Sequence, residues 1–288
     1  MIRLKHLITE DQTDPNHNIE GGTRSVGLEI DVAKKIFKKR CGEYRSVRYT
    51  GSQIFRGLAY TNPRPLLFVR PSKSYRMAKN TDNFTNAILD IIPSWRDWPK
   101  RSKSIVCSSR EGSAQFYGKV FEVFPFDGAI IGICPSRDFW DSFPIVEKRL
   151  SKAKEQQIDW FNYSMPDALK KLGYTADYWR YYPEDAENLF KYLDSKVQRN
   201  PKIFDDILEA ATENGIDSRT KRILLDMRTN FKTSESYFDE LFNPEKNGFE
   251  KVPISKYHTN SNVDQEVWTE SDSLMINTKV ISRFIDSL

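Results

Sequence analysis

The sequence predicts an α+β fold in which a strand-rich core is interrupted by a large helical insertion. Short apolar runs rich in β-branched and aromatic residues dominate the first half of the chain. Helical periodicity dominates residues 144–243, and short strands return after them. We therefore expect residues 1–143 and 244–288 to build one sheet core, with 144–243 inserted into it.

The composition is typical of a globular protein, with 288 residues, 39% hydrophobic residues and a formal net charge of +4. No run approaches the ~20 consecutive apolar residues that a membrane-spanning helix needs. The N-terminal segment carries acids and a proline too early for a secretory signal. Three cysteines without CxxC spacing and only three histidines argue against a disulfide scaffold and a zinc site. We expect a cytoplasmic protein without a metal and without membrane contact.

Elements can be assigned in order through the first half of the chain. Apolar residues at helical spacing and a lysine-rich end predict a helix over 28–40. Residues 52–60 are predicted as a strand, and the proline-punctuated 61–71 as an extended loop. A short helix is expected over 82–95, ended by Pro93. Three apolar segments bounded by Gly or Pro predict further strands at 104–109, 119–125 and 129–135.

The second half opens with the helical block. Its periodicity predicts helices over 145–161, 184–198, 201–213 and 219–231. Past residue 243, strands are predicted at 265–269 and 273–276, followed by a last helix over 278–288. The return of strands after the helices indicates an inserted block and not an appended one.

Arg56 and the serines after residue 107 are the first candidates for a functional site. An arginine in the apolar segment 54–58 costs several kcal/mol when buried without an ion partner, and Gly57 beside it permits close approach of a ligand. The strand 105–109 ends in Ser108 and Ser109, whose small hydroxyls can bond a sugar or orient a carboxylate. Taken singly, each feature also fits a solvent-facing strand residue or a strand end that enters a turn.

Asp264 and Glu266 are the second candidate, because residues i and i+2 of a strand share one face. Two like charges placed side by side repel each other unless a substrate hydroxyl or a cation lies between them. Carboxylates of this kind stabilise the positive charge that develops in sugar transfer. A solvated hairpin edge is the simpler alternative.

In this order, the segments 55-FRG-57, 105-IVCSS-109 and 264-DQEVW-268 resemble the Arg–Ser–Glu pattern of the ADP-ribosyltransferase family. That pattern is an aromatic–Arg–Gly strand, an apolar run ending in Ser-Thr-Ser, and Glu-x-Glu before an apolar strand. The residues after the second motif, 113-SAQFYG-118 and 119-KVFEVFP-125, also resemble the family's short helix and proline-ended strand. The resemblance covers residues 50–140 and 250–277 and leaves the helical block unaccounted for.

The resemblance implies a split mixed β-sheet core and an NAD-dependent mono-ADP-ribosyltransferase that needs no metal. Arg56 would bind a phosphate-bearing part of NAD, and the backbone of Gly57 would hold the nicotinamide amide. The remaining NAD-site residues would be Cys107, Ser108, Ser109 and an aromatic that flanks the nicotinamide, Phe116 or Tyr117.

The catalytic pair implied by the resemblance is Glu266 and Asp264. Glu266 would hydrogen-bond the ribose 2′-hydroxyl and stabilise positive charge as the glycosidic bond breaks. Asp264 would face a macromolecular acceptor, which is a protein or a nucleic acid. Similar transferases occur as bacterial toxins and as phage proteins that act on host machinery, so a phage member would work in the host cytoplasm.

Two departures from the family pattern leave alternatives open. Cys107 stands where the first serine is expected, unless Ser108 takes that place with a shift of one residue. Asp264 replaces the first glutamate, at the position associated with the choice of acceptor. These departures favour the alternative of a transferase-like binding or structural protein without catalysis. Nucleic-acid engagement by the helical block and the basic segment 96–104 is a further possibility.

The catalytic acid also has a rival in the segment 136-SRDFWDSF-143. Its acids would follow the third strand at a more usual distance if the helical block were appended. We prefer Glu266, because 266-EVW-268 keeps an acid directly before an apolar strand, whereas 138–143 is more typical of a helix start.

Overall fold

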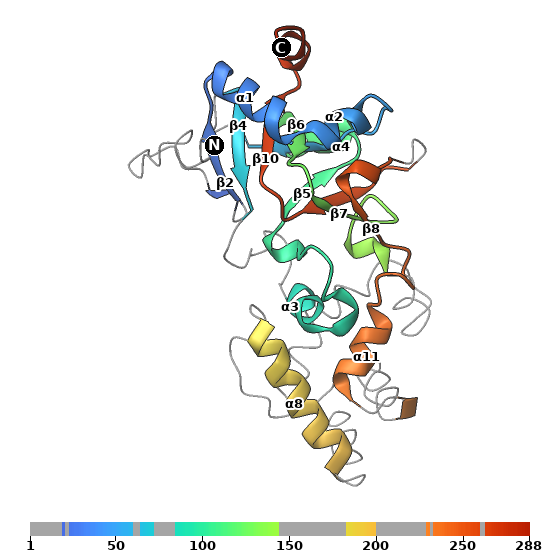
Figure 1. Ribbon diagram of the computed structural model, residues 1–288. Coiled ribbons are helices and arrows are strands. Elements are labelled where there is room, and N and C mark those ends of the chain that lie inside the picture. Colours follow the sequence, from blue (N-terminus) through green and yellow to red (C-terminus); the bar gives the residue numbers. More distant parts are fainter. Residues whose placement is uncertain are drawn as a thin grey trace. The chain divides into compact units, whose positions relative to one another are not determined.

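The computed structural model describes residues 19–20, 23–59, 64–71, 84–143, 183–199, 229–230, 233–259 and 263–288 (Figure 1). Contacts divide the chain into two compact units. The first comprises Met1–Arg76, Lys103–Asp138 and Lys251–Leu288, and the second Met77–Ser102 and Phe139–Glu250. The expected α+β class is confirmed, because an antiparallel sheet and several helices make up these residues.

The first unit is built on a ten-stranded sheet in the order β1-β2-β4-β10-β6-β3-β5-β9-β7-β8. The eight pairings from β1–β2 to β9–β7 are antiparallel, so the prediction of a mixed sheet is wrong for them. The strands are β1 (Ile19–Glu20), β2 (Thr23–Gly27), β3 (Phe55–Leu58), β4 (Leu66–Arg70), β5 (Ile105–Ser108), β6 (Lys119–Pro125), β7 (Ile130–Ile133), β8 (Glu250–Pro253), β9 (Glu266–Thr269) and β10 (Ser273–Asn277).

This sheet is folded back on itself between β10 and β9. The two strands are joined by only three residues, 270–272, which reach ~14 Å when extended. In a flat sheet the strands would lie four spacings apart, or ~19 Å. The equally distant strands β6 and β7 are joined by only four residues, 126–129. Both short connections require the two halves of the sheet to turn toward each other.

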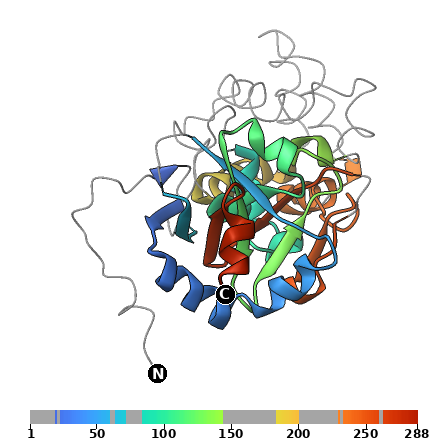
Figure 2. The same cartoon turned by 90° about the horizontal axis from the view of Figure 1, so that it is seen from above.

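Helices α1 (Ile30–Arg40), α2 (Gly42–Arg48) and α12 (Ile281–Asp286) pack against the half of the sheet that contains β6 (Figures 1 and 2). Phe37 of α1 places its ring 5.1 Å from that of Phe124 and 5.5 Å from that of Phe284. Tyr44 of α2 contacts the same Phe124 ring edge-on at 5.1 Å. Burial of these rings holds α1 and α2 on the sheet and α12 against α1, since each aromatic side chain removes a large apolar area from water.

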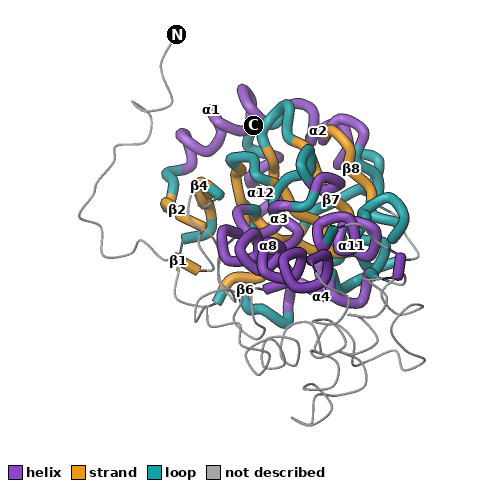
Figure 3. Tube along the Cα trace, turned by 90° about the horizontal axis from the view of Figure 1, so that it is seen from below, coloured by secondary structure: helices purple, strands orange, loops and turns teal. Residues whose placement is uncertain are grey.

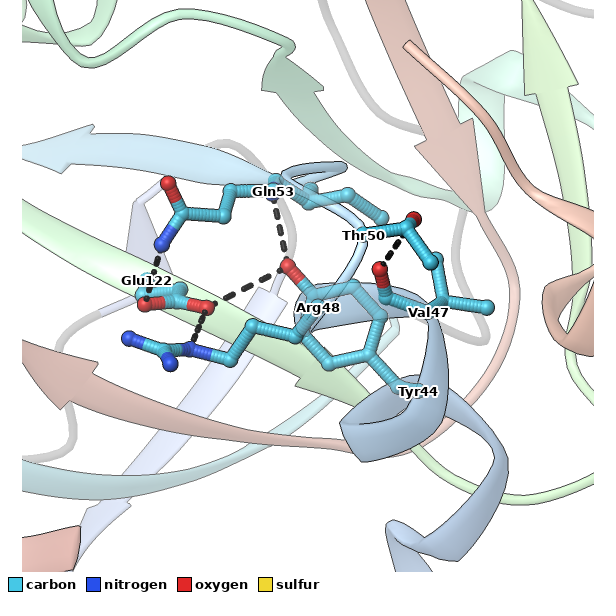
Figure 4. Close-up of polar contacts among 7 residues, drawn as sticks. Tyr44, Val47, Arg48, Thr50, Gln53 and Glu122 are labelled. Atoms are coloured by element: carbon cyan, nitrogen blue, oxygen red, sulfur yellow. Dashed lines mark hydrogen bonds and ion pairs between the residues drawn. The ribbon is translucent and has the colours of Figure 1, made fainter.

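A buried carboxylate ties α2 to the start of β3 (Figure 4). Glu122 of β6 is 1% exposed and accepts a 2.7 Å bond from Arg48 Nε. Gln53 Nε2 donates to its second oxygen at 3.3 Å, and the Tyr44 hydroxyl lies 3.5 Å from the first. The same hydroxyl accepts from the backbone N–H of Ile54 at 2.7 Å. The network therefore fixes the residues that lead into β3.

The predicted elements of the first unit agree with the structure at most positions. The helix expected over 28–40 is α1, and the strands expected around β3, β5, β6, β7, β9 and β10 are present. The loop prediction for 61–71 is wrong, because Leu66–Arg70 form β4 between β2 and β10. The prolines at 63 and 65 precede the strand, and the four apolar residues after them are buried as in a central strand. Strands β1, β2 and β8 and helix α2 were not predicted.

In the second unit, α3 (Phe84–Ile91) and α11 (Ser234–Leu241) both contact α8 (Pro183–Arg199) (Figure 3). Phe190 of α8 stacks on Phe238 of α11 at 5.1 Å. Helix α8 confirms the helix predicted over 184–198, and α3 the one predicted over 82–95. The helices predicted over 145–161 and 201–213 lie outside the described residues, as does 219–231 apart from 229–230.

The contact division places 77–102 with the helical unit, and the predicted domain boundaries at 143 and 243 stay predictions. None of the helices in the described part of the chain is long and apolar enough to span a bilayer.

The Glu122 network predicts an unusual pH dependence. Burial raises the pKa of Glu122 above 4.5, against the opposing effect of Arg48. The native state then binds the carboxyl proton of Glu122 more tightly than the unfolded chain does. The contribution of Glu122 to stability is therefore greatest at low pH. It falls as the pH rises through 4.5 and on toward the native pKa. Replacing Glu122 by Gln removes this titration, so the free energy of unfolding of Glu122→Gln should rise relative to wild type between acid and neutral pH.

Urea unfolding over that pH range measures this difference. The exposed Glu250→Gln is the matched control and should follow the wild-type pH profile. A pH-independent difference between Glu122→Gln and wild type would contradict the assignment.

Candidate functional site

The three sequence motifs lie on three adjacent strands of the first unit. Arg56 is on β3, Ser108 ends β5 and Glu266 begins β9, and β5 pairs with both neighbours. Ser108 lies directly opposite Glu266 in the β5–β9 register, so their side chains share one face. Ser108 is also registered opposite Phe55, so the side chain of Arg56, the next residue of β3, extends from the other face at this register. Segments far apart in the sequence are therefore brought together here.

Arg56 is half-buried, and its guanidinium reaches across to the neighbouring strand. Its Nη1 donates a 3.1 Å hydrogen bond to the carbonyl of Val106 on β5. A strand carbonyl is a weaker partner for a guanidinium than a carboxylate or phosphate. The contact holds the side chain beside β5, two residues before Ser108.

Asp264 is compensated by its own surroundings. Its Oδ1 accepts a 3.0 Å bond from Ser108 Oγ, and its Oδ2 accepts from Ser113 Oγ. Arg137 Nε lies 3.8 Å from the same Oδ2. Two hydroxyls and a guanidinium explain why Asp264 tolerates Glu266 two residues away. Asp264 thereby connects the end of β5, α4 (Glu111–Gln115) and the segment after β7.

Gly57 has a packing role that the sequence did not indicate. A Cβ at this position would lie 2.0 Å from the carbonyl oxygen of Ala114 and 2.9 Å from Cβ of Tyr117. Helix α4 therefore lies directly on the α-carbon of Gly57. Ala114, Phe55 and Val120 form a small buried cluster around this contact. The absent side chain allows α4 to carry Ser113 to Asp264.

The other serine-motif residues have different surroundings. Cys107 is 7% exposed, belongs to the hydrophobic core and points to the face of β5 opposite Ser108. Ser109 is buried and clamps Gln265, since its Oγ accepts from Gln265 N at 2.9 Å and its N–H donates to Gln265 O at 2.9 Å. Cys107 is thus not brought into the cluster, and Ser109 acts on the backbone between the two acids.

Phe116 follows α4 and is 78% exposed. The guanidinium carbon of Arg137 lies 5.3 Å from the centre of its ring. Sequence reasoning considered 136–143 only for its acids and missed Arg137, although a basic residue beside an acid-rich motif was a usable signal. Asp138 of this segment is exposed, and only a 3₁₀ turn, η4 (Trp140–Ser142), follows it.

Residues 134–136 also hold the backbone at the start of β9. The N–H of Glu266 donates to the carbonyl of Ser136 at 3.1 Å, and Cys134 N–H donates to the carbonyl of Glu266 at 2.9 Å. Gln265 Nε2 adds a 2.9 Å bond to Cys134 O. Glu266 therefore stands on a strand end that is fixed on both sides, by β5 and by the end of β7.

Within the described residues, no group of three His, Cys, Asp or Glu side chains is arranged to hold a metal ion. A small cavity lies in the second unit, lined by Trp95, Phe139 and residues of α3 and the segment 99–101. Comparison with protein-family models, with curated proteins and with solved structures found no match.

The packing of α4 on β3 yields a direct test. Gly57→Ala should destabilise the protein by about 1–3 kcal/mol, because the new methyl group collides with a backbone carbonyl that cannot move without shifting α4. Gly112→Ala is the matched control, since Gly112 lies within α4 and has open space around it. That change should stabilise by about 0.5–1 kcal/mol. Equal effects in denaturant unfolding would show that α4 does not rest on Gly57.

Proposed function

We propose that the chain is an NAD-dependent mono-ADP-ribosyltransferase, a glycosyltransferase that moves ADP-ribose from NAD to a macromolecular acceptor. The observation that carries this proposal is the placement of Arg56, Ser108 and Glu266 on the adjacent strands β3, β5 and β9. A guanidinium, a hydroxyl and a carboxylate supplied by three separate segments are what the Arg–Ser–Glu pattern requires. The folded sheet supports the finer proposal of a split transferase-like core, since two halves joined by short connections meet at these strands.

In the proposed reaction, the bond between C1′ of the ribose and the nicotinamide nitrogen breaks, and its electron pair leaves with nicotinamide. A lone pair of the acceptor forms the new bond to C1′, and the acceptor loses a proton to solvent. Glu266 stabilises the positive charge on the ribose and binds its 2′-hydroxyl. Ser108, directly opposite on β5, limits the orientations available to Glu266.

Arg56 binds a phosphate of NAD in this scheme. Its guanidinium lies beside β5, where it donates to the carbonyl of Val106, and its positive charge suits a phosphate. NAD enters as a substrate, no metal takes part, and the acceptor is a protein or nucleic acid away from the membrane. The proposed setting is the cytoplasm, which is the host cytoplasm for a phage protein.

A second candidate is a binding or structural protein that keeps the sheet without catalysis. The observation in its favour is that both oxygens of Asp264 are already used by protein groups and Cys107 lies in the core. Release of nicotinamide from NAD separates the two candidates, because only the transferase breaks the glycosidic bond.

Replacing Glu266 by Gln tests the proposed role of this carboxylate. The change keeps the shape and removes the charge, so the rate of nicotinamide release should fall by about 10²–10³-fold. Chromatographic detection of nicotinamide, together with transfer of labelled ADP-ribose to lysate components, measures the loss. NAD affinity should change less than the rate, because the charge acts mainly on the transition state.

Glu29→Gln is the control, since it removes an exposed carboxylate that precedes α1. It should retain the wild-type rate. Wild-type turnover in Glu266→Gln would remove Glu266 from the mechanism. No nicotinamide release by the wild-type protein in the presence of lysate would favour the non-catalytic candidate.

A further inference from the structure

The side chains of Arg137 and Phe116 form an exposed pair beside Asp264. Arg137 is 63% exposed and Phe116 is 78% exposed, and the guanidinium lies over the ring at 5.3 Å. Tyr117, the next residue, is 74% exposed. An exposed aromatic ring beneath a guanidinium offers a stacking surface and a positive charge at one place, which narrows the chemistry of a partner that would bind there.

The guanidinium of Arg137 contacts the protein through its Nε and its flat face. Its Nε faces Oδ2 of Asp264 at 3.8 Å, and its flat face covers the Phe116 ring. Within the described residues, its two Nη groups make no hydrogen bond. A guanidinium fixed in this way presents a fork of donors that suits a phosphate.

Asp264 is already compensated by groups of the protein. Each of its oxygens accepts a serine hydroxyl, and its charge is opposed by Arg137. A cationic acceptor, such as an arginine or lysine side chain of a protein, would meet the exposed guanidinium first and be repelled. An acceptor with negative charge and flat rings would be attracted to both residues of the pair.

We infer that Arg137 and Phe116 bind the acceptor, and that the acceptor is a single-stranded nucleic acid. This inference rests on the proposed function, because it names the substrate class of the same site. A phosphate binds the Nη groups of Arg137, and an unpaired base stacks on the open face of Phe116 or on Tyr117. Stacking requires bases outside a duplex, so a single strand fits this surface and a paired one does not.

The location agrees with an acceptor role. Arg137 follows Ser136, whose carbonyl accepts the N–H of Glu266 at 3.1 Å. Phe116 follows α4, which supplies Ser113 to Asp264. A single-stranded nucleic acid bound by Arg137 and Phe116 would therefore lie next to Glu266, the carboxylate proposed to act on the ribose of NAD.

Fluorescence anisotropy with labelled RNA and DNA oligonucleotides of one sequence, single-stranded and as duplexes, tests the inference on the full chain. Phe116→Leu should weaken single-strand binding at least about fivefold, whereas Phe116→Tyr should retain it, because only the ring matters. Arg137→Gln should weaken binding to a similar extent and lower the salt slope by about one, because one phosphate contact is lost. Arg137→Lys should keep the salt slope.

Arg283→Gln is the matched control, because it removes an exposed positive charge from α12. It should bind as wild type does. Circular dichroism of each variant verifies folding. Failure of the wild-type protein to bind either single strand would overturn the inference, as would equal affinity for duplexes, or binding that is unchanged in both Phe116→Leu and Arg137→Gln.

Nicotinamide release and NAD binding by the wild-type protein are measured in parallel, so that the two proposals fail separately. Cleavage of NAD without single-strand binding removes the acceptor inference and leaves the transferase. Single-strand binding through Arg137 and Phe116 without any NAD binding removes the transferase and the acceptor role together.

Discussion

The pairing of β5 with both β3 and β9 is the constraint on which the candidate site depends. It places Ser108 opposite Glu266 and beside the strand of Arg56, and it joins residues far apart in the sequence, such as Ser108 and Asp264, which are 156 positions apart. Such long-range pairings require the loops between them to close, at a cost in chain entropy that local contacts cannot recover. The buried supports around β5 offset this cost: the Glu122 network before β3, the Ser109–Gln265 clamp and the packing of α4 on Gly57.

Asp264 and Glu266 are chemically similar but have different surroundings in the structure. Asp264 is satisfied by Ser108, Ser113 and Arg137, so its place in the structure is to join three segments and to position Arg137. Glu266 shares a face with Ser108 at the start of β9. The sequence could reveal the spacing of the acids but not this division, because Ser113 and Arg137 come from segments whose approach depends on the folded sheet.

Local patterns were sufficient for most strands and helices of the first unit, and Arg56, Ser108 and Glu266 lie on the adjacent strands β3, β5 and β9. They failed where tertiary burial decides, as at β4, where four apolar residues behind two prolines become a central strand. They also could not place Cys107 in the hydrophobic core, since a shift of one residue along β5 changes the face that a side chain occupies. Gly57 was recognised as permissive, but its partner, the carbonyl of Ala114, lies far along the chain and could not be inferred.

The central claim is that β3, the end of β5 and the start of β9 form one NAD site. Hydrogen–deuterium exchange with and without NAD tests it most directly, because it reports every segment at once. The account predicts slower exchange in 55–58, 105–110 and 264–268 when NAD is present, with little change in α8 and α11. NAD-dependent protection confined to other segments, or no protection at saturating NAD, would contradict it.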